Sequence, residues 1–205
     1  MSISLVIPTL DAQAEIGELL NRLLSQTCCP DEIIVVDSAS SDSTVEIASS
    51  VDGVRVIEID RSDFNHGLTR DMAFKESFGD IVCFMTQDAV PADERYIENL
   101  VEPILADSRV AISSGRQLPK KDAREFERLV REFNYGPTSN VRSKDDIPVM
   151  GIKAYFATDV CSAYRRSSYF ELGGFGERGH AYGRKGCRGG LFGCVCCRCV
   201  CVPLA

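Results

Sequence analysis

Apolar runs that alternate with helix-like segments are the feature of this sequence that most restricts the fold. In residues 1–110, short apolar runs are separated by segments whose apolar positions recur at helical spacing. The expected strands are 3–7, 32–36, 54–59, 81–85 and 110–113, and the expected helices are 14–25, 42–49, 68–77 and 94–105. Such alternation predicts a single Rossmann-like α/β domain, with a mostly parallel sheet flanked by helices and joined by right-handed crossovers.

Two of the predicted strands are followed by an isolated aspartate. Asp37 closes the run EIIVVD, and Asp88 follows the run IVCFMTQ. Because open α/β sheets bind ligands beyond the carboxyl ends of their strands, both carboxylates are expected in one crevice. One can accept hydrogen bonds from a base or a sugar hydroxyl, and the other can hold a divalent cation that carries a diphosphate. The pattern indicates a nucleotide-sugar site, although a helix cap at Asp37 and a turn residue at Asp88 are the alternatives.

Composition narrows the class of protein. The chain has 205 residues, 44% of them apolar, which fits one globular α/β domain. A net charge of −7 and a pI near 5.0 argue against nucleic acid as a partner. The sequence has neither an apolar run long enough to span a bilayer nor the features of a signal peptide, so a cytoplasmic protein is expected.

The middle of the chain is less regular. Residues 122–133 have the spacing of an amphipathic helix, and 134–150 read as a polar, irregular loop beside the site. A further strand is expected within 158–164 and a short helix within 166–172.

Several motifs occur in the order found in a known family. The stretch VIPTLDAQAEIGELLNRLLSQTCCPDEIIVVDSASSDST resembles the opening of the family 2 glycosyltransferases, which have the GT-A fold. FNHGLTRDMAF and CFMTQDAVP resemble the rhamnosyltransferase-like branch, and SAYRRSSYFELGGFGE resembles the segment that closes its catalytic domain. The resemblance covers residues 3–177.

This resemblance implies an enzyme that moves a sugar, with rhamnose as the leading candidate, from a dTDP- or UDP-linked donor. The implied acceptor is a saccharide or a lipid-linked molecule in bacterial surface polysaccharide assembly, and the reaction inverts the anomeric carbon. The implied cofactor is Mg²⁺ or Mn²⁺. A lipid-linked acceptor would be compatible with peripheral association at the inner face of the membrane.

The resemblance also implies roles for individual residues. Asp88 is the implied metal ligand, although Val90 stands where many relatives have a second Asp, and the carbonyl of Gln87 is a further candidate ligand. The positions implied to bind the nucleotide are Pro8, Thr9, Asp11, Asp37, Asn65, His66, Arg70 and Gln87. Those implied on the acceptor side are Arg165, Gly173, Gly174 and Phe175.

The catalytic base is the main gap in the pattern. Inverting transfer needs a carboxylate that takes the proton of the acceptor hydroxyl, and the family has an acidic pair shortly after the Gly-Gly-Phe motif. Here Glu177, the last acidic residue, is the remaining candidate for the base, although it matches the Glu before that pair rather than the pair itself. An inactive fragment, or a nucleotide-sugar-binding module without the base, is therefore the alternative. An NAD-linked enzyme is disfavoured because no GxGxxG follows the first strand.

The last 28 residues differ from the rest of the chain. Residues 178–205 contain no Asp or Glu, six Cys and six Gly. Their overlapping CxxC spacings suit Zn²⁺ formally but do not make two separate pairs. We expect a GT-A domain over 1–177 that lacks its C-terminal part, and a tail over 178–205 without regular structure, such as translation of a shifted reading frame would give.

Overall fold

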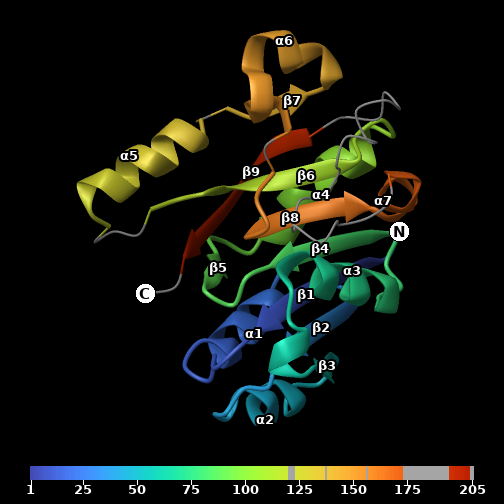
Figure 1. The fold of residues 1–205 in the computed structure, drawn as a ribbon, viewed down its shortest axis with the longest axis vertical. Helices are drawn as coiled ribbons and strands as arrows, with labels where there is room; N and C mark the ends of the chain where they lie inside the picture. Colours follow the sequence, from blue (N-terminus) through green and yellow to red (C-terminus); the bar gives the residue numbers. More distant parts are fainter. Residues whose placement is uncertain (120–122, 137, 156, 173–193, 204–205) are drawn as a thin grey trace.

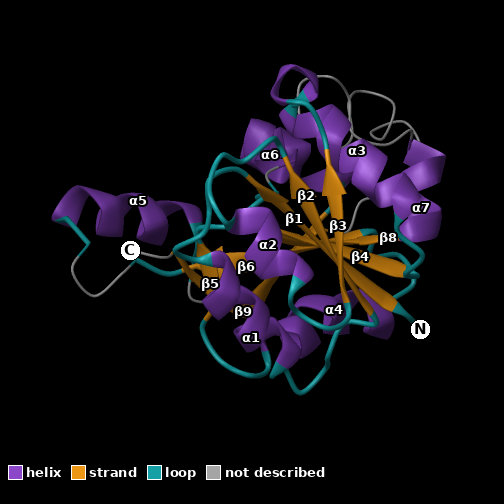
Figure 2. Ribbon diagram, turned by 90° about the horizontal axis from the view of Figure 1, so that it is seen from below, coloured by secondary structure: helices purple, strands orange, loops and turns teal. Residues whose placement is uncertain are grey.

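The computed structural model describes residues 1–119, 123–136, 138–155, 157–172 and 194–203. Within this part of the chain nine strands form one sheet, and helices lie on both of its faces (Figures 1 and 2). The strand order is β3-β2-β1-β4-β8-β6-β9-β5, and β7 pairs with β9.

The first half of the chain alternates strand and helix as predicted. Its elements are β1 (Ile3–Thr9), α1 (Ile16–Leu24), β2 (Glu32–Asp37), α2 (Thr44–Ser49), β3 (Val54–Glu58), α3 (His66–Glu76), β4 (Ile81–Met85), β5 (Ala89–Pro91) and α4 (Tyr96–Ala106). The elements that follow are β6 (Ile112–Gln117), α5 (Glu125–Asn134), β7 (Asn140–Arg142), α6 (Ile147–Met150), β8 (Cys161–Arg165), α7 (Arg166–Leu172) and β9 (Cys194–Pro203).

Strands β3, β2, β1 and β4 are mutually parallel, which brings their carboxyl ends to one edge of the sheet. Thr9, the last residue of β1, pairs with Asp37, the last residue of β2. On the other side of β1, Val6 pairs with Phe84, so β4 ends at the same edge. This edge is where the two predicted carboxylates were expected to meet.

The other half of the sheet is mixed. β8 is antiparallel to both β4 and β6, so β6 runs in the same direction as β4. β5 and β7 pair antiparallel with β9, which is itself parallel to β6. The α/β class is confirmed, and the parallel arrangement holds for the first four strands of the sequence.

Two apolar clusters fill the faces of the sheet because strand side chains alternate sides. Leu5 and Ile7 of β1 face one cluster with α1 and α4, while Val6 faces the other with α3 and α7. Every residue of β2 is buried, as expected for a parallel strand covered on both faces. None of the helices in the described ranges combines the length and apolarity needed to span a bilayer.

The structure differs from two sequence-based expectations. The predicted irregular loop over 134–150 contains β7, a short 3₁₀ turn (Lys144–Asp146) and α6. The tail was expected to lack regular structure, yet residues 194–203 form β9 between β6 on one side and β5 and β7 on the other. The segment CVCCRCVCVP has no regular alternation of polar and apolar residues, so periodicity gave no signal for this strand.

Candidate nucleotide-sugar site

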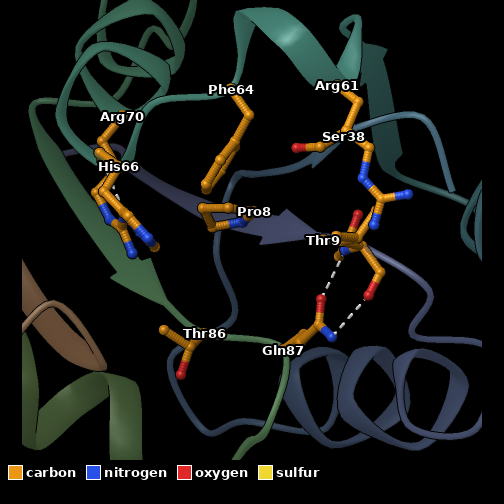
Figure 3. Close-up of a pocket in the computed structure, with 10 residues that line it drawn as sticks. Pro8, Thr9, Ser38, Arg61, Phe64, His66, Arg70, Thr86 and Gln87 are labelled. Atoms are coloured by element: carbon orange, nitrogen blue, oxygen red, sulfur yellow. Dashed lines mark hydrogen bonds between the residues drawn. The ribbon is translucent and has the colours of Figure 1, made fainter.

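A cavity of about 270 Å³ opens beyond the carboxyl ends of β1, β2 and β4. Figure 3 shows Arg61 and Ser38 on one side, His66 and Arg70 on the other, and Pro8 and Phe64 between them. The residues that line it are Pro8, Thr9, Leu10, Ser38, Arg61, Phe64, His66, Arg70, Thr86 and Gln87. Parallel strands therefore create the crevice at the edge where open α/β sheets bind ligands.

Asp37 fixes the walls of this cavity and is not among its lining residues. Its Oδ1 accepts hydrogen bonds from the hydroxyls of Thr9 (3.0 Å) and Ser40 (2.5 Å), and its Oδ2 accepts from the Ser40 backbone N–H (2.7 Å). The side chain is buried. These bonds join the loop after β1 to the loop after β2 and hold the adjacent Ser38 at the cavity.

Asp11 adds a second link between the same loops. Its backbone N–H donates to the Ser40 hydroxyl (2.8 Å), and its Oδ1 accepts from the Ser41 N–H (2.8 Å). Asp11 and Ala39 both have positive φ, 47° and 59°, a region that costs an L-residue roughly 1–2 kcal/mol. Both loops are thus held in strained backbone beside the cavity, and Asp11, too, is absent from the lining.

Gln87 closes the floor between β1 and β4. Its Oε1 accepts from the Leu10 N–H (2.8 Å) and its Nε2 donates to the Leu10 carbonyl (3.0 Å), as Figure 3 shows. The side chain lines the cavity, but its amide oxygen is already used by the backbone. The expectation that this carbonyl could serve as a metal ligand is therefore not supported by the geometry.

Three buried polar atoms of the lining have no hydrogen-bond partner within the described residues. They are the hydroxyl oxygens of Ser38 and Thr86 and the Nε of Arg70. Arg70 is 4% exposed, and its Nη1 donates only to the His66 carbonyl, at 2.7 Å. Buried polar groups are normally paired, so orphaned ones that face a cavity point to a polar ligand.

The charge of the cavity has one sign. Among the described residues, its lining includes the cations of Arg61 and Arg70 and no Asp or Glu. No ion pair of Arg70 occurs among the described residues. A buried guanidinium without a carboxylate is costly unless an anion pairs with it, which suits a phosphate-bearing ligand.

Helix α3 presents its N-terminus to the same region. The Asn65 Oδ1 caps it by accepting from the N–H groups of Gly67 (2.9 Å) and Leu68 (3.1 Å). Asn65 is therefore occupied as a helix cap and does not line the cavity. His66 does line it, and its ring meets that of Phe64 edge-on with centroids 4.9 Å apart.

Asp88 lies next to Gln87 in the chain, just outside the lining. It is exposed, and no hydrogen bond or ion pair involving it occurs within the described ranges. No cluster of three or more His, Cys, Asp or Glu side chains in the described residues is arranged to hold a metal. A free carboxylate fits a divalent cation only if water and phosphate oxygens complete its ligand shell.

Arg165, predicted on the acceptor side, lies away from the cavity because of its strand direction. Because β8 runs antiparallel to β4, Arg165 pairs with Ile81, the first residue of β4, at the edge opposite the cavity. Its guanidinium donates to the backbone carbonyls of Ile104, Val110 and Asp107. Arg165 thus ties the end of α4 to β6 and has a structural role.

The remaining predicted positions lie outside the described residues. They are Gly173, Gly174, Phe175 and Glu177.

Of the predicted nucleotide-binding residues, the structure brings five to the cavity: Pro8, Thr9, His66, Arg70 and Gln87. Sequence reasoning missed Ser38, Arg61, Phe64 and Thr86, which also line it. Phe64 and Thr86 belong to motifs that were recognised, FNHGLTR and CFMTQDAVP, where attention fell on their charged or amide-bearing neighbours. Nothing in the local pattern distinguishes Arg61 from other surface arginines.

Comparison with known proteins agrees with this architecture. The O-antigen chain rhamnosyltransferase RfbN of Salmonella typhimurium is 44% identical over 178 residues, which are 86% of this chain and 56% of that protein. The O-antigen chain rhamnosyltransferase WbaN of Salmonella anatum is 39% identical with the same coverage. The chain spans about half the length of these curated relatives.

The fold recurs in solved structures. The mannosyltransferase PcManGT from Pyrobaculum calidifontis, in complex with GDP-Man and Mn²⁺, superposes with a TM-score of 0.69 at 22% identity, covering 98% of this chain and 56% of that one. The GT-A fold is thereby confirmed. Residues 4–173 match the family described as Glycosyl transferase family 2, and the chain belongs to that family.

Proposed function

We propose that this chain binds a nucleotide-diphospho-sugar in the cavity and transfers its sugar to a saccharide or lipid-linked acceptor during assembly of a bacterial surface polysaccharide. The observation that carries the proposal is the buried Arg70, which has no carboxylate partner among the described residues and lines a cavity whose described lining contains no acidic side chain. The names of the rhamnosyltransferase relatives favour rhamnose as the sugar. A dTDP-linked donor is the proposal that follows from the sequence resemblance.

Each part of the cavity then has a chemical task. The hydroxyls of Ser38 and Thr86 are free to bond the base or ribose, and the Nε of Arg70 is free to bond a phosphate oxygen. In the transfer, the acceptor hydroxyl attacks the anomeric carbon, the bond from that carbon to the diphosphate breaks, and the hydroxyl proton passes to a base. Cationic groups at the leaving diphosphate favour the step because charge develops there.

A divalent cation is the proposed cofactor, held by Asp88 together with phosphate oxygens. When bound, it would neutralise negative charge on the departing diphosphate. Its support is the exposed carboxylate of Asp88, which lies next to the cavity and has no partner among the described residues, together with the Mn²⁺ named for the solved mannosyltransferase.

Calorimetric titration of dTDP and UDP, with and without Mn²⁺, tests donor binding. We expect Mn²⁺ to strengthen binding to the unmodified chain but not to Asp88→Asn. Asp52→Asn is the matched control, because this exposed carboxylate precedes β3 at the opposite edge of the sheet. If the folded chain binds neither nucleotide, the proposal is wrong. Equal enhancement by Mn²⁺ in Asp88→Asn refutes only the metal assignment.

A second candidate is a module that binds the donor without transferring the sugar. It is favoured by the absence of any carboxylate from the described lining of the cavity, where a base would have to act. Release of dTDP from dTDP-rhamnose, measured with and without a lipid-linked saccharide, separates the two. Acceptor-dependent release supports the transferase, and tight binding with no release supports the binding module.

A further inference from the structure

Helix α5 has an apolar face that is largely open to solvent. Its residues Phe126, Leu129 and Phe133 are 78%, 56% and 73% exposed, and Val130 is 38% exposed. Their spacing places them on one side of the helix. None of the residues of α5 is buried, and Figures 1 and 2 show the helix extending away from the sheet.

The opposite side of α5 is charged. The six charged residues around it are Arg124, Glu125, Glu127, Arg128, Arg131 and Glu132. The Lys153 ammonium lies 3.6 Å from the centroid of the Phe133 ring, so a cation also borders the apolar face. Phe and Leu on one face, with three arginines and three glutamates on the other, make an amphipathic helix of the kind that lies in a bilayer interface.

The surrounding segment has a charge opposite to that of the whole chain. Residues 116–153 contain nine basic and six acidic side chains, a net charge of +3. The other 167 residues contain 14 basic and 24 acidic side chains. The apolar helix therefore lies in the part of an acidic protein that an anionic surface would attract.

The topology relates α5 to the cavity. β6 runs in the same direction as β4, so its last residue, Gln117, lies at the cavity edge of the sheet. The chain continues from there towards α5, which begins at Glu125. A surface that receives α5 would lie on the side of the molecule where the cavity opens.

We propose that α5 docks in the interface of an anionic lipid bilayer, with Phe126, Leu129 and Phe133 among the acyl chains and the arginines at the headgroups. Docking of α5 would bring the cavity close to a lipid-linked acceptor, and in this respect the inference rests on the proposed function. Binding to lipid can nevertheless be measured without nucleotide or acceptor, so the two proposals can fail separately.

A tryptophan reporter provides the test, because the chain contains no Trp. Phe126→Trp places a single indole on α5, and Phe78→Trp places one at another exposed Phe, just before β4 at the opposite edge of the sheet. With vesicles of phosphatidylcholine and phosphatidylglycerol, we expect a blue shift and quenching by brominated lipid for Phe126→Trp only. No shift at Phe126→Trp, or equal shifts at both positions, would overturn the proposal.

Cosedimentation with the same vesicles, using protein without a Trp substitution, gives a second readout. Replacing Phe126 and Phe133 together by Gln should lower the partition coefficient by about tenfold or more, because burial of apolar area drives interfacial binding. Phe78→Gln should leave it unchanged, and pure phosphatidylcholine should bind more weakly than the anionic mixture. Undiminished binding of the double variant to vesicles refutes the proposal. It is also refuted if neither protein binds vesicles and the unmodified chain instead forms a concentration-dependent dimer that the double variant does not form.

Discussion

Replacement of Arg70 by Met should weaken nucleotide binding without lowering the stability of the nucleotide-free protein. Arg70 is 4% exposed, and its guanidinium makes one hydrogen bond, to the His66 carbonyl, while its Nε has no partner among the described residues. A charge-assisted hydrogen bond from this group to a phosphate oxygen is worth about 1.5–3 kcal/mol. Since about 1.4 kcal/mol corresponds to a factor of ten, the Kd for dTDP should rise roughly 10- to 150-fold.

The stability of the nucleotide-free protein should be unchanged or increased by the same substitution. A buried cation without a carboxylate partner is destabilising, and Met retains much of the apolar volume of the Arg stem. We therefore expect the free energy of unfolding of Arg70→Met to be equal to or higher than that of the unmodified chain. Arg70→Lys, which keeps the charge but loses the planar fork, should have an intermediate Kd.

Two measurements check this reasoning: urea unfolding of the free protein and calorimetric titration with dTDP. Arg109→Met is the control, since Arg109 is a highly exposed cation paired with Asp107 just before β6, at the edge opposite the cavity. An unchanged Kd in Arg70→Met would refute the assignment. A large loss of stability would show instead that Arg70 supports the fold, and its proximity to the cavity would then carry no functional meaning.

Two further predictions concern stability. Gly79→Ala should lower the free energy of unfolding, measured with urea, by about 1–3 kcal/mol, because the new Cβ would lie 2.5 Å from the Ser4 backbone nitrogen. Gly17→Ala within α1 meets only an ordinary contact at 3.5 Å and should raise it by roughly 0.5–1 kcal/mol. Similar losses for both variants would contradict the packing argument. Hydrogen bonds from the backbone N–H and hydroxyl of Ser2 lower the pKa of Asp80, so its contribution to stability is present above the ordinary carboxyl pKa and is lost as the pH falls through the lowered value. Asp80→Asn should accordingly reduce the Tm at neutral pH, with a difference that shrinks towards pH 3, and a pH-independent difference measured by circular dichroism would refute the linkage.

The parallel half of the sheet could be predicted because its elements are determined locally. The apolar interior of β2 (Ile33–Val36) and the helical spacing of α1 are both visible in the sequence, and the alternation of strands and helices leaves few topologies. The edge on which the cavity lies follows from the same alternation. Strand β9 could not be predicted, because its only local signal is a run of Cys and Val, and its partners are more than 50 residues away in the chain.

The candidate site, like the fold, was predictable in part from the sequence. The sequence by itself determined the family resemblance, the two strand-ending carboxylates, and the turn of Pro8 and Thr9. Only the tertiary structure decided which polar atoms are free. In the folded chain, the side chains of Asp37 and Asn65 are bonded to loops and to the start of a helix. The hydroxyls of Ser38 and Thr86 and the Nε of Arg70 have no partner among the described residues. The reason is physical: residue type fixes what a side chain can bond, whereas long-range packing fixes which of those bonds are already made when the ligand arrives.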